Sequence, residues 1–136
     1  MPYATPKWVE EAGAKGHHYV PGKGIDPGGG THWEPDYDDP IFLEKLDHFL
    51  AAAGARYDGR PEVAFIDVGT FGVWGEGHTF HTTKLGYTAE TVIRHIDLHR
   101  KHFPRTLLRR QRRLRQPGPR PGVDRVCRRP RPDAPG

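Results

Sequence analysis

The residue pattern best suited to chemistry surrounds Glu76, which has Trp74 two positions before it and His78 two positions after it. The segment is rich in glycine and follows a short apolar run, 63–66. Such a run is typical of a strand buried on both faces, and in α/β folds reactive side chains gather at the carboxyl ends of these strands. A carboxylate there can act as a general acid or base. Because an aromatic neighbourhood disfavours the carboxylate anion, Trp74 would help to keep Glu76 protonated near neutral pH.

These side chains also have ordinary structural interpretations. Glu76 could be a solvated loop carboxylate, and His78 could make a structural hydrogen bond instead of contacting a ligand or tuning Glu76. Trp33 and Trp74 could stack on a ligand or pack against the protein. Asp67 lies near the end of the expected strand, where a charge is usually paired or hydrogen-bonded. We therefore interpret Asp67 as a supporting residue that orients a neighbouring strand or loop.

One helix and one strand are expected to position this segment. The helix is predicted over 40–57, because Asp38 and Asp39 offer an N-cap, a proline suits the first helical position, and apolar residues recur with the spacing of one buried face. The strand is predicted over 62–68, after a tight turn. A helix followed by a tight turn and a buried strand is half of a β/α repeat, so the chain is expected to have an α/β fold.

A second helix is predicted over 89–102, with Thr88 as its N-cap. Its apolar face is expected to contain Val92, Ile93, Ile96 and Phe103. His95, His99 and His102 follow its other side at spacings that can place ligands on one face. The HExxH pattern is absent, so we interpret these histidines as a solvated row and expect neither a metal nor another cofactor. The first 35 residues are expected to be mostly loop, with one short helix near 7–14.

Charge divides the chain sharply. Residues 1–104 carry ten Lys and Arg against fifteen Asp and Glu, whereas residues 105–136 carry eleven Arg against two Asp. Residues 109–136 contain too few apolar side chains to offset the entropy of ordering, so this tail is expected to be disordered and to pack against nothing. Because the composition changes inside an apparent strand, we interpret the tail as the product of a frameshift or truncation near Arg109. The alternative is a basic arm that binds nucleic acid or another anionic partner.

The remaining composition limits the class of protein. Cys127 is the single cysteine, which excludes an internal disulfide. No apolar run approaches the length of a membrane helix, and the first residues do not resemble a signal peptide. A cytoplasmic location without a membrane partner is therefore the default expectation, and no sequence pattern indicates an oligomeric state.

Three segments carry a family resemblance: 33–46, 55–69 and 71–79. Together they resemble bacterial glycoside-hydrolase-type TIM barrels, in the group related to the large retaining clan that includes β-galactosidase-like proteins. The resemblance implies that residues 1–108 are part of a (β/α)8 barrel and that residues 109–136 are a separate tail. It also places Glu76 at the position of the general acid/base, although Gly75 stands where that clan usually has asparagine.

The resemblance further implies hydrolysis of O-glycosyl bonds in a carbohydrate substrate, with Trp33, Trp74 and His78 as substrate-binding residues. Glycoside hydrolysis needs two carboxyl groups on either side of the scissile bond. In that clan the second comes from the seventh strand, and a complete barrel takes about 250 residues. This chain is therefore expected to be a fragment without activity of its own. The alternative function is a small non-enzymatic module whose working part is the arginine-rich arm.

Overall fold

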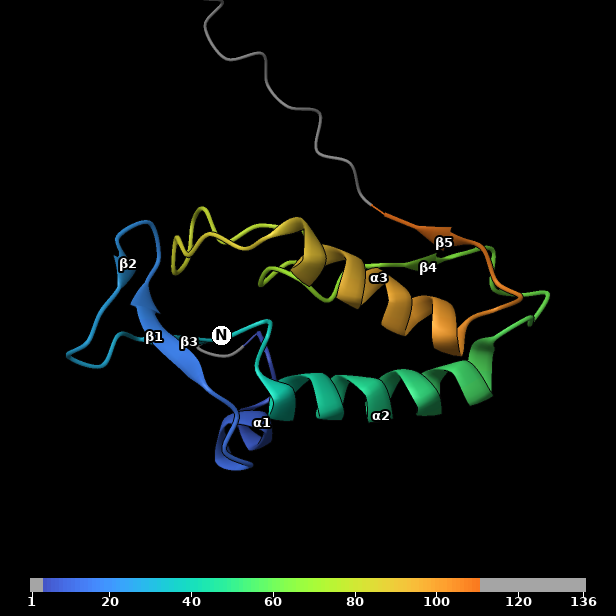
Figure 1. The fold of residues 1–136 in the computed structure, drawn as a ribbon, viewed down its shortest axis with the longest axis horizontal. Helices are drawn as coiled ribbons and strands as arrows, with labels where there is room; N and C mark the ends of the chain where they lie inside the picture. The colour runs from blue at the N-terminus through green and yellow to red at the C-terminus, as the bar shows by residue number, and fades with distance from the viewer. Residues whose placement is uncertain (1–3, 111–136) are drawn as a thin grey trace, which may run out of the picture.

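The computed structural model describes residues 4–110, which form three helices and two small sheets (Figure 1). The elements follow in the order α1 (Lys7–Glu11), β1 (Gly16–Val20), β2 (Gly24–Ile25), β3 (His32–Pro35), α2 (Pro40–Tyr57), β4 (Ile66–Asp67), α3 (Ala89–His102) and β5 (Leu108–Arg109). No helix among these residues is long and apolar enough to cross a membrane. The predictions for the tail concern residues that lie almost entirely outside the described part of the chain.

The N-terminal third forms a three-stranded antiparallel sheet in the order β2-β1-β3. It lies at one end of the described region in Figure 1. β1 pairs with β3 from Gly16 opposite Pro35 to Tyr19 opposite His32. A side chain at position 16 would overlap the indole of Trp33, so glycine permits this close pairing. The prediction of a mostly unstructured N-terminus was wrong. Strands pair through backbone N–H and C=O groups, and every residue except proline has both, so side-chain periodicity did not reveal this sheet.

Helix α2 has the bounds that the sequence predicts. Asp39 is its N-cap, and one carboxylate oxygen, Oδ1, accepts hydrogen bonds from the backbone N–H groups of Ile41 and Phe42, each at 2.9 Å. The buried positions of the helix are Phe42, Leu46, Leu50 and Gly54. The local signals for this helix, an acidic cap and an apolar residue every three or four positions, were therefore sufficient to locate it.

Gly54 on α2 lies against the end of α3, where an added Cβ would overlap the carbonyl oxygen of His102. Replacing a helical glycine with alanine normally stabilises a helix by ~1 kcal/mol. At this position we expect Gly54→Ala to lower the free energy of unfolding by about 1–2 kcal/mol, because the helices must separate. Urea denaturation measures the change. The exposed Ala52→Gly, with its ordinary helix cost, is the matched control, and a stabilised Gly54→Ala would contradict the close approach.

The second sheet is a parallel pair joined by a helical crossover. Ile66 pairs with Leu108 and Asp67 with Arg109, while α3 connects the two strands and packs against α2 (Figure 1). The predicted strand 62–68 is reduced to two residues. A strand extends only as far as a neighbour pairs with it, and β5 offers two residues within the described chain.

The hydrophobic core lies between α2, α3 and the segments that precede and follow them. Its buried members are Val9, Ala14, Trp33, Tyr37, Phe42, Leu46, Leu50, Phe71 and Phe103. The ring of Tyr37 is central, with edge-on contacts to Phe71 at 4.7 Å and to Tyr87 at 5.6 Å between centroids. These contacts join the turn before α2 to the loop that contains Glu76.

The prediction of a partial (β/α)8 barrel was wrong. In the described residues the larger sheet is antiparallel and only one pair of strands is parallel, whereas the strands of such a barrel are all parallel. The chain is a small mixed α/β structure with no closed barrel among residues 4–110. The error arose because helix–turn–strand periodicity is a local signal and does not specify how many strands come together.

Candidate functional site

Glu76 lies in a glycine-rich loop between β4 and α3. The loop is closed by hydrogen bonds from the N–H of Gly75 to the carbonyl of Gly72 at 2.9 Å and from the N–H of Gly77 to the carbonyl of Phe71 at 2.8 Å. Gly72 adopts a left-handed backbone conformation with φ of 91°. A Cβ at this position would lie 2.7 Å from Oε2 of Glu76, so glycine is required for the carboxylate to occupy its place.

The carboxylate of Glu76 is buried, with only 5% of its side chain exposed. Oε2 accepts a hydrogen bond from the N–H of Trp74 at 2.9 Å. Oε1 is buried and has no hydrogen-bond partner among the described residues. Leaving a buried carboxylate oxygen unpaired is energetically costly, and native structures contain few such groups outside functional sites. Glu76 is therefore the strongest candidate for a functional carboxylate in the described chain.

His78 lies beside this oxygen, with Nδ1 3.8 Å from Oε1 of Glu76. Nδ1 also accepts a hydrogen bond from the N–H of Phe80 at 3.2 Å, so the proton of the neutral ring is on Nε2. The rings of His78, Phe80 and His81 form a cluster with centroids 5.0–6.4 Å apart. The loop therefore presents a hydrogen-bond donor and exposed aromatic rings close to the buried carboxylate.

A second carboxylate, Glu34 on β3, is completely buried. Oε1 accepts a hydrogen bond from the hydroxyl of Tyr37 at 2.9 Å, and Oε2 accepts from the N–H and hydroxyl of Thr83 at 3.2 and 2.7 Å. Sequence reasoning missed this residue. Its only local signal was a charged side chain between Trp33 and Pro35, both of which are buried.

Both carboxylates affect the pKa values of Tyr19 and Tyr37. Burial raises the pKa of Tyr37 well above its ordinary value, and the charges of Glu34 and Glu76 add to this effect. Burial also raises the pKa of Tyr19, again with contributions from Glu34 and Glu76. The fold thus brings β1, β3 and the Glu76 loop together around two acidic groups and two neutral phenols.

The other predicted site residues are distributed differently. Trp33 is 3% exposed and belongs to the core, whereas Trp74 is 70% exposed in the Glu76 loop. Of the two, Trp74 is the one in a position to stack on a ligand. Asp67 lies on β4, opposite Arg109, and is exposed. Its charge affects the pKa of His99. The structure therefore brings together Trp74, Glu76 and His78, but not Trp33.

The interpretation of the α3 histidines as a solvated row was wrong for His95 and His99, which are 1% and 2% exposed. Nε2 of His95 donates to the carbonyl of Tyr37 at 3.0 Å, and Nδ1 of His99 donates to the carbonyl of His95 at 2.8 Å. The partner of His95 comes from a distant segment and that of His99 from the helix itself, while Ile93 on the expected apolar face is half exposed. The described residues contain no cluster of three or more potential metal ligands.

The buried histidines predict a dependence of stability on pH. Burial lowers the pKa of both His95 and His99 below the unfolded value of ~6.5. Below that pH the unfolded chain therefore binds more protons than the folded chain. The free energy of unfolding has its highest value above pH ~6.5 and falls as the pH drops towards the folded-state pKa. We expect a lower urea midpoint at pH 5.5 than at pH 7.5. The exposed His48→Gln should leave this difference unchanged, whereas an equal midpoint at both pH values in the wild type would contradict the prediction.

Comparison with known proteins adds no relative. No protein-family model matches the sequence, and neither a curated protein nor a solved structure is significantly similar to it. The resemblance to glycoside-hydrolase-type barrels therefore has no support from related families, and the architecture of the described residues contradicts it. Any function must be argued from the geometry of the site itself.

Proposed function

We propose that the Glu76 loop is the acid/base half of a carbohydrate-hydrolysing site. The observation that carries the proposal is the buried carboxylate of Glu76, whose Oε1 has no hydrogen-bond partner among the described residues. Oε2 accepts a hydrogen bond from the backbone N–H of Trp74, and the indole of Trp74 is exposed in the same loop. A glycosidic oxygen is a suitable partner for such a group, because it takes a proton from a carboxylic acid as the bond breaks. The indole is a flat apolar surface on which a sugar ring can stack.

The roles of the three loop residues follow from their positions. Glu76 is the general acid that protonates the leaving oxygen. Nε2 of His78 carries a proton in the neutral ring and donates a hydrogen bond to a sugar hydroxyl. Trp74 supplies the stacking surface. The inferred substrate is a glycoside, and this chemistry needs no resident cofactor.

Hydrolysis needs a second carboxylate as nucleophile or base, ~5–5.5 Å from the first for retention or ~6.5–9.5 Å for inversion. Glu34 is unsuited to this role, because it is completely buried and its two oxygens already accept three hydrogen bonds. Glu34 therefore does not supply the second carboxylate. Glycoside binding, which needs only the Glu76 loop, is therefore the property to test.

Binding provides the test. Titration of the 136-residue chain with methyl and aryl glycosides, followed by calorimetry or amide chemical shifts, should show saturable binding. Trp74→Ala should weaken it about tenfold, since aromatic contacts contribute ~0.5–1.5 kcal/mol beyond the area they bury. Trp8→Ala is the matched control, because Trp8 is also exposed but belongs to α1.

The amide shifts should be largest in residues 72–80, which contain Trp74, Glu76 and His78. The proposal fails if no glycoside in the panel binds. It also fails if Trp8→Ala and Trp74→Ala weaken binding equally, because the binding surface would then lie elsewhere.

A further inference from the structure

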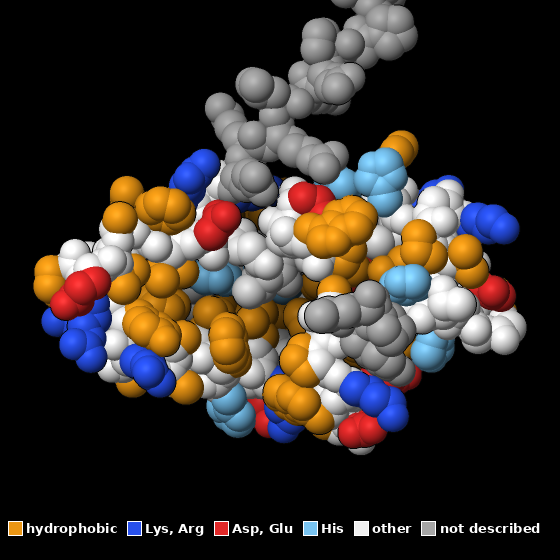
Figure 2. Space-filling view, turned by 180° about the vertical axis from the view of Figure 1, so that it is seen from behind, with side chains coloured by type: hydrophobic (Ala, Val, Ile, Leu, Met, Phe, Trp, Pro, Cys, Tyr) orange, Lys and Arg blue, Asp and Glu red, His pale blue; other side chains and the backbone are white. Residues whose placement is uncertain are grey.

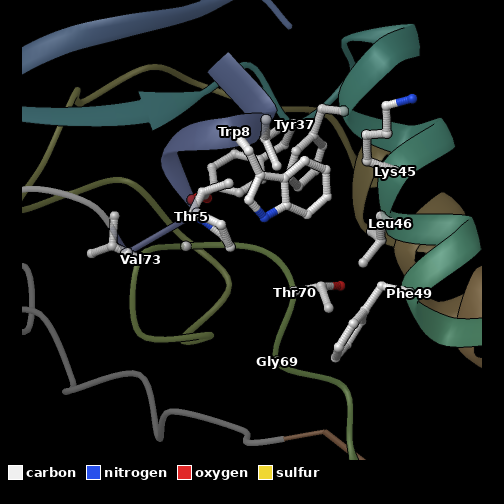
Figure 3. Close-up of a pocket in the computed structure, with 14 residues that line it drawn as sticks. Thr5, Trp8, Tyr37, Lys45, Leu46, Phe49, Gly69, Thr70 and Val73 are labelled. Carbon is white, nitrogen blue, oxygen red and sulfur yellow. The ribbon is translucent and has the colours of Figure 1, made fainter. Parts of the chain in front are cut away.

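An apolar groove of about 300 Å³ lies between α1, α2 and the segment that follows β4 (Figure 3). Trp8 lies towards one end of the groove, and Phe49 and Thr70 lie towards the other. Hydrophobic side chains are abundant on the face of the molecule seen in Figure 2. A volume of this size is at the lower limit for small-molecule sites, so the groove suits a short apolar group.

Thr70, half-buried in the groove, is hydrogen-bonded to a buried histidine. Its hydroxyl oxygen lies 3.0 Å from Nδ1 of His95. Nε2 of His95 lies 3.0 Å from the carbonyl oxygen of Tyr37, which can only accept, so Nε2 carries the ring proton. Nδ1 is then the acceptor, and the hydroxyl of Thr70 donates to it. The hydrogen bonds thus define both the tautomer and the direction of the proton.

This arrangement has the three parts of an activated nucleophile. The hydroxyl is the nucleophile, the imidazole is a base within hydrogen-bonding distance, and the carbonyl of Tyr37 orients the base. Desolvation lowers the pKa of His95, which keeps the ring neutral and able to accept a proton near neutral pH. The glycoside chemistry proposed for Glu76 uses neither Thr70 nor His95.

We propose that Thr70 and His95 form a nucleophile–base pair that accepts an acyl group from an ester, with a short apolar acyl chain bound in the groove beside Trp8 and Phe49. The lining is mostly apolar, with Leu46 and Val73 among its members, and this favours an acyl chain over a sugar or a charged ligand. Gly72 also borders the groove, and its N–H is the candidate donor for the developing oxyanion.

The chemistry balances without an external reagent other than water. The oxygen of Thr70 bonds to the ester carbonyl carbon while its proton passes to Nδ1 of His95. The bond to the leaving oxygen then breaks, and this oxygen takes the proton from Nδ1 and departs as an alcohol. Water attacks the acyl-Thr70 carbonyl carbon, again with its proton passing to Nδ1, and the carboxylic acid leaves as the oxygen of Thr70 recovers that proton.

The test uses the full 136-residue chain and p-nitrophenyl butyrate. Release of nitrophenolate gives the rate, and mass spectrometry of tryptic peptides locates the butyryl group. We expect acylation on Thr70. Thr70→Val, which replaces the hydroxyl with a methyl group of similar size, should lower the rate at least about tenfold, because a positioned base contributes ~10²–10⁴. Thr70→Ser, which keeps a hydroxyl at this position, should retain acylation.

The matched control is Thr31→Val, because the hydroxyl of Thr31 also lies beside a histidine, 2.8 Å from Nδ1 of His32, but on the exposed surface. It should leave the rate unchanged. The rate should rise with pH as His95 loses its proton, and Phe49→Glu should weaken binding of the ester. Circular dichroism checks that each variant is folded. Acylation found only on lysines or on other histidines, or an unchanged rate in folded Thr70→Val, would overturn the proposal.

Discussion

Trp33→Ala is expected to unfold the protein or to lower its free energy of unfolding by about 3–5 kcal/mol, the usual cost of truncating a buried aromatic side chain. Trp33 is 3% exposed, belongs to the core and lies against Gly16 on the neighbouring strand. Because small domains have a total stability of about 5–15 kcal/mol, this loss is a large fraction of it. Urea denaturation monitored by circular dichroism measures the change.

Trp74→Ala is the matched control for Trp33→Ala. Trp74 is 70% exposed, so its truncation should change the free energy of unfolding by no more than about 0.5 kcal/mol. The pair separates a packing role from the ligand-stacking role that the sequence predicts for both residues. A Trp33→Ala variant that keeps wild-type stability but loses glycoside binding would show that the indole of Trp33 contacts ligand.

Glu34→Ala is expected to lower the free energy of unfolding by about 2–4 kcal/mol. The carboxylate accepts hydrogen bonds from the hydroxyl of Tyr37 and from the N–H and hydroxyl of Thr83, all of them buried. Each buried donor left without an acceptor costs ~1–3 kcal/mol, although relaxation of the loop reduces the sum. The same urea measurement applies, with amide shifts of residues 79–85 reporting the loss of order in that loop.

Glu34→Gln provides the comparison for this network. The amide keeps the shape of the side chain and one acceptor oxygen, so we expect a smaller loss of stability than in Glu34→Ala. If Glu34→Ala unfolds at the same urea concentration as the wild type, the network does not stabilise the fold. The link that it makes between β3 and the loop beside Glu76 would then be dispensable.

The sequence by itself determined the two long helices, because an N-cap and the spacing of apolar residues are patterns within a few neighbouring positions. The side chain of Asp39 caps α2 by accepting hydrogen bonds from the N–H groups of Ile41 and Phe42. The bounds of α2 and α3 are those that periodicity and capping predict. Short-range sequence patterns also predicted a candidate site in the loop around Glu76. Glycine at position 72 leaves room for the carboxylate of Glu76, which is only four positions further along the chain.

Only the tertiary structure decided the sheets and the chemical environment of the site. Strand pairing depends on neighbours far along the chain, which is why a helix–turn–strand pattern did not reveal an antiparallel sheet in the first 35 residues or limit β4 to two residues. The hydroxyl of Thr83 meets Glu34 across 49 positions, and Thr70 meets His95 across 25. His95 on the polar face of α3 is buried with hydrogen-bond partners from distant segments, Thr70 and Tyr37, and periodicity along one helix carries no information about them.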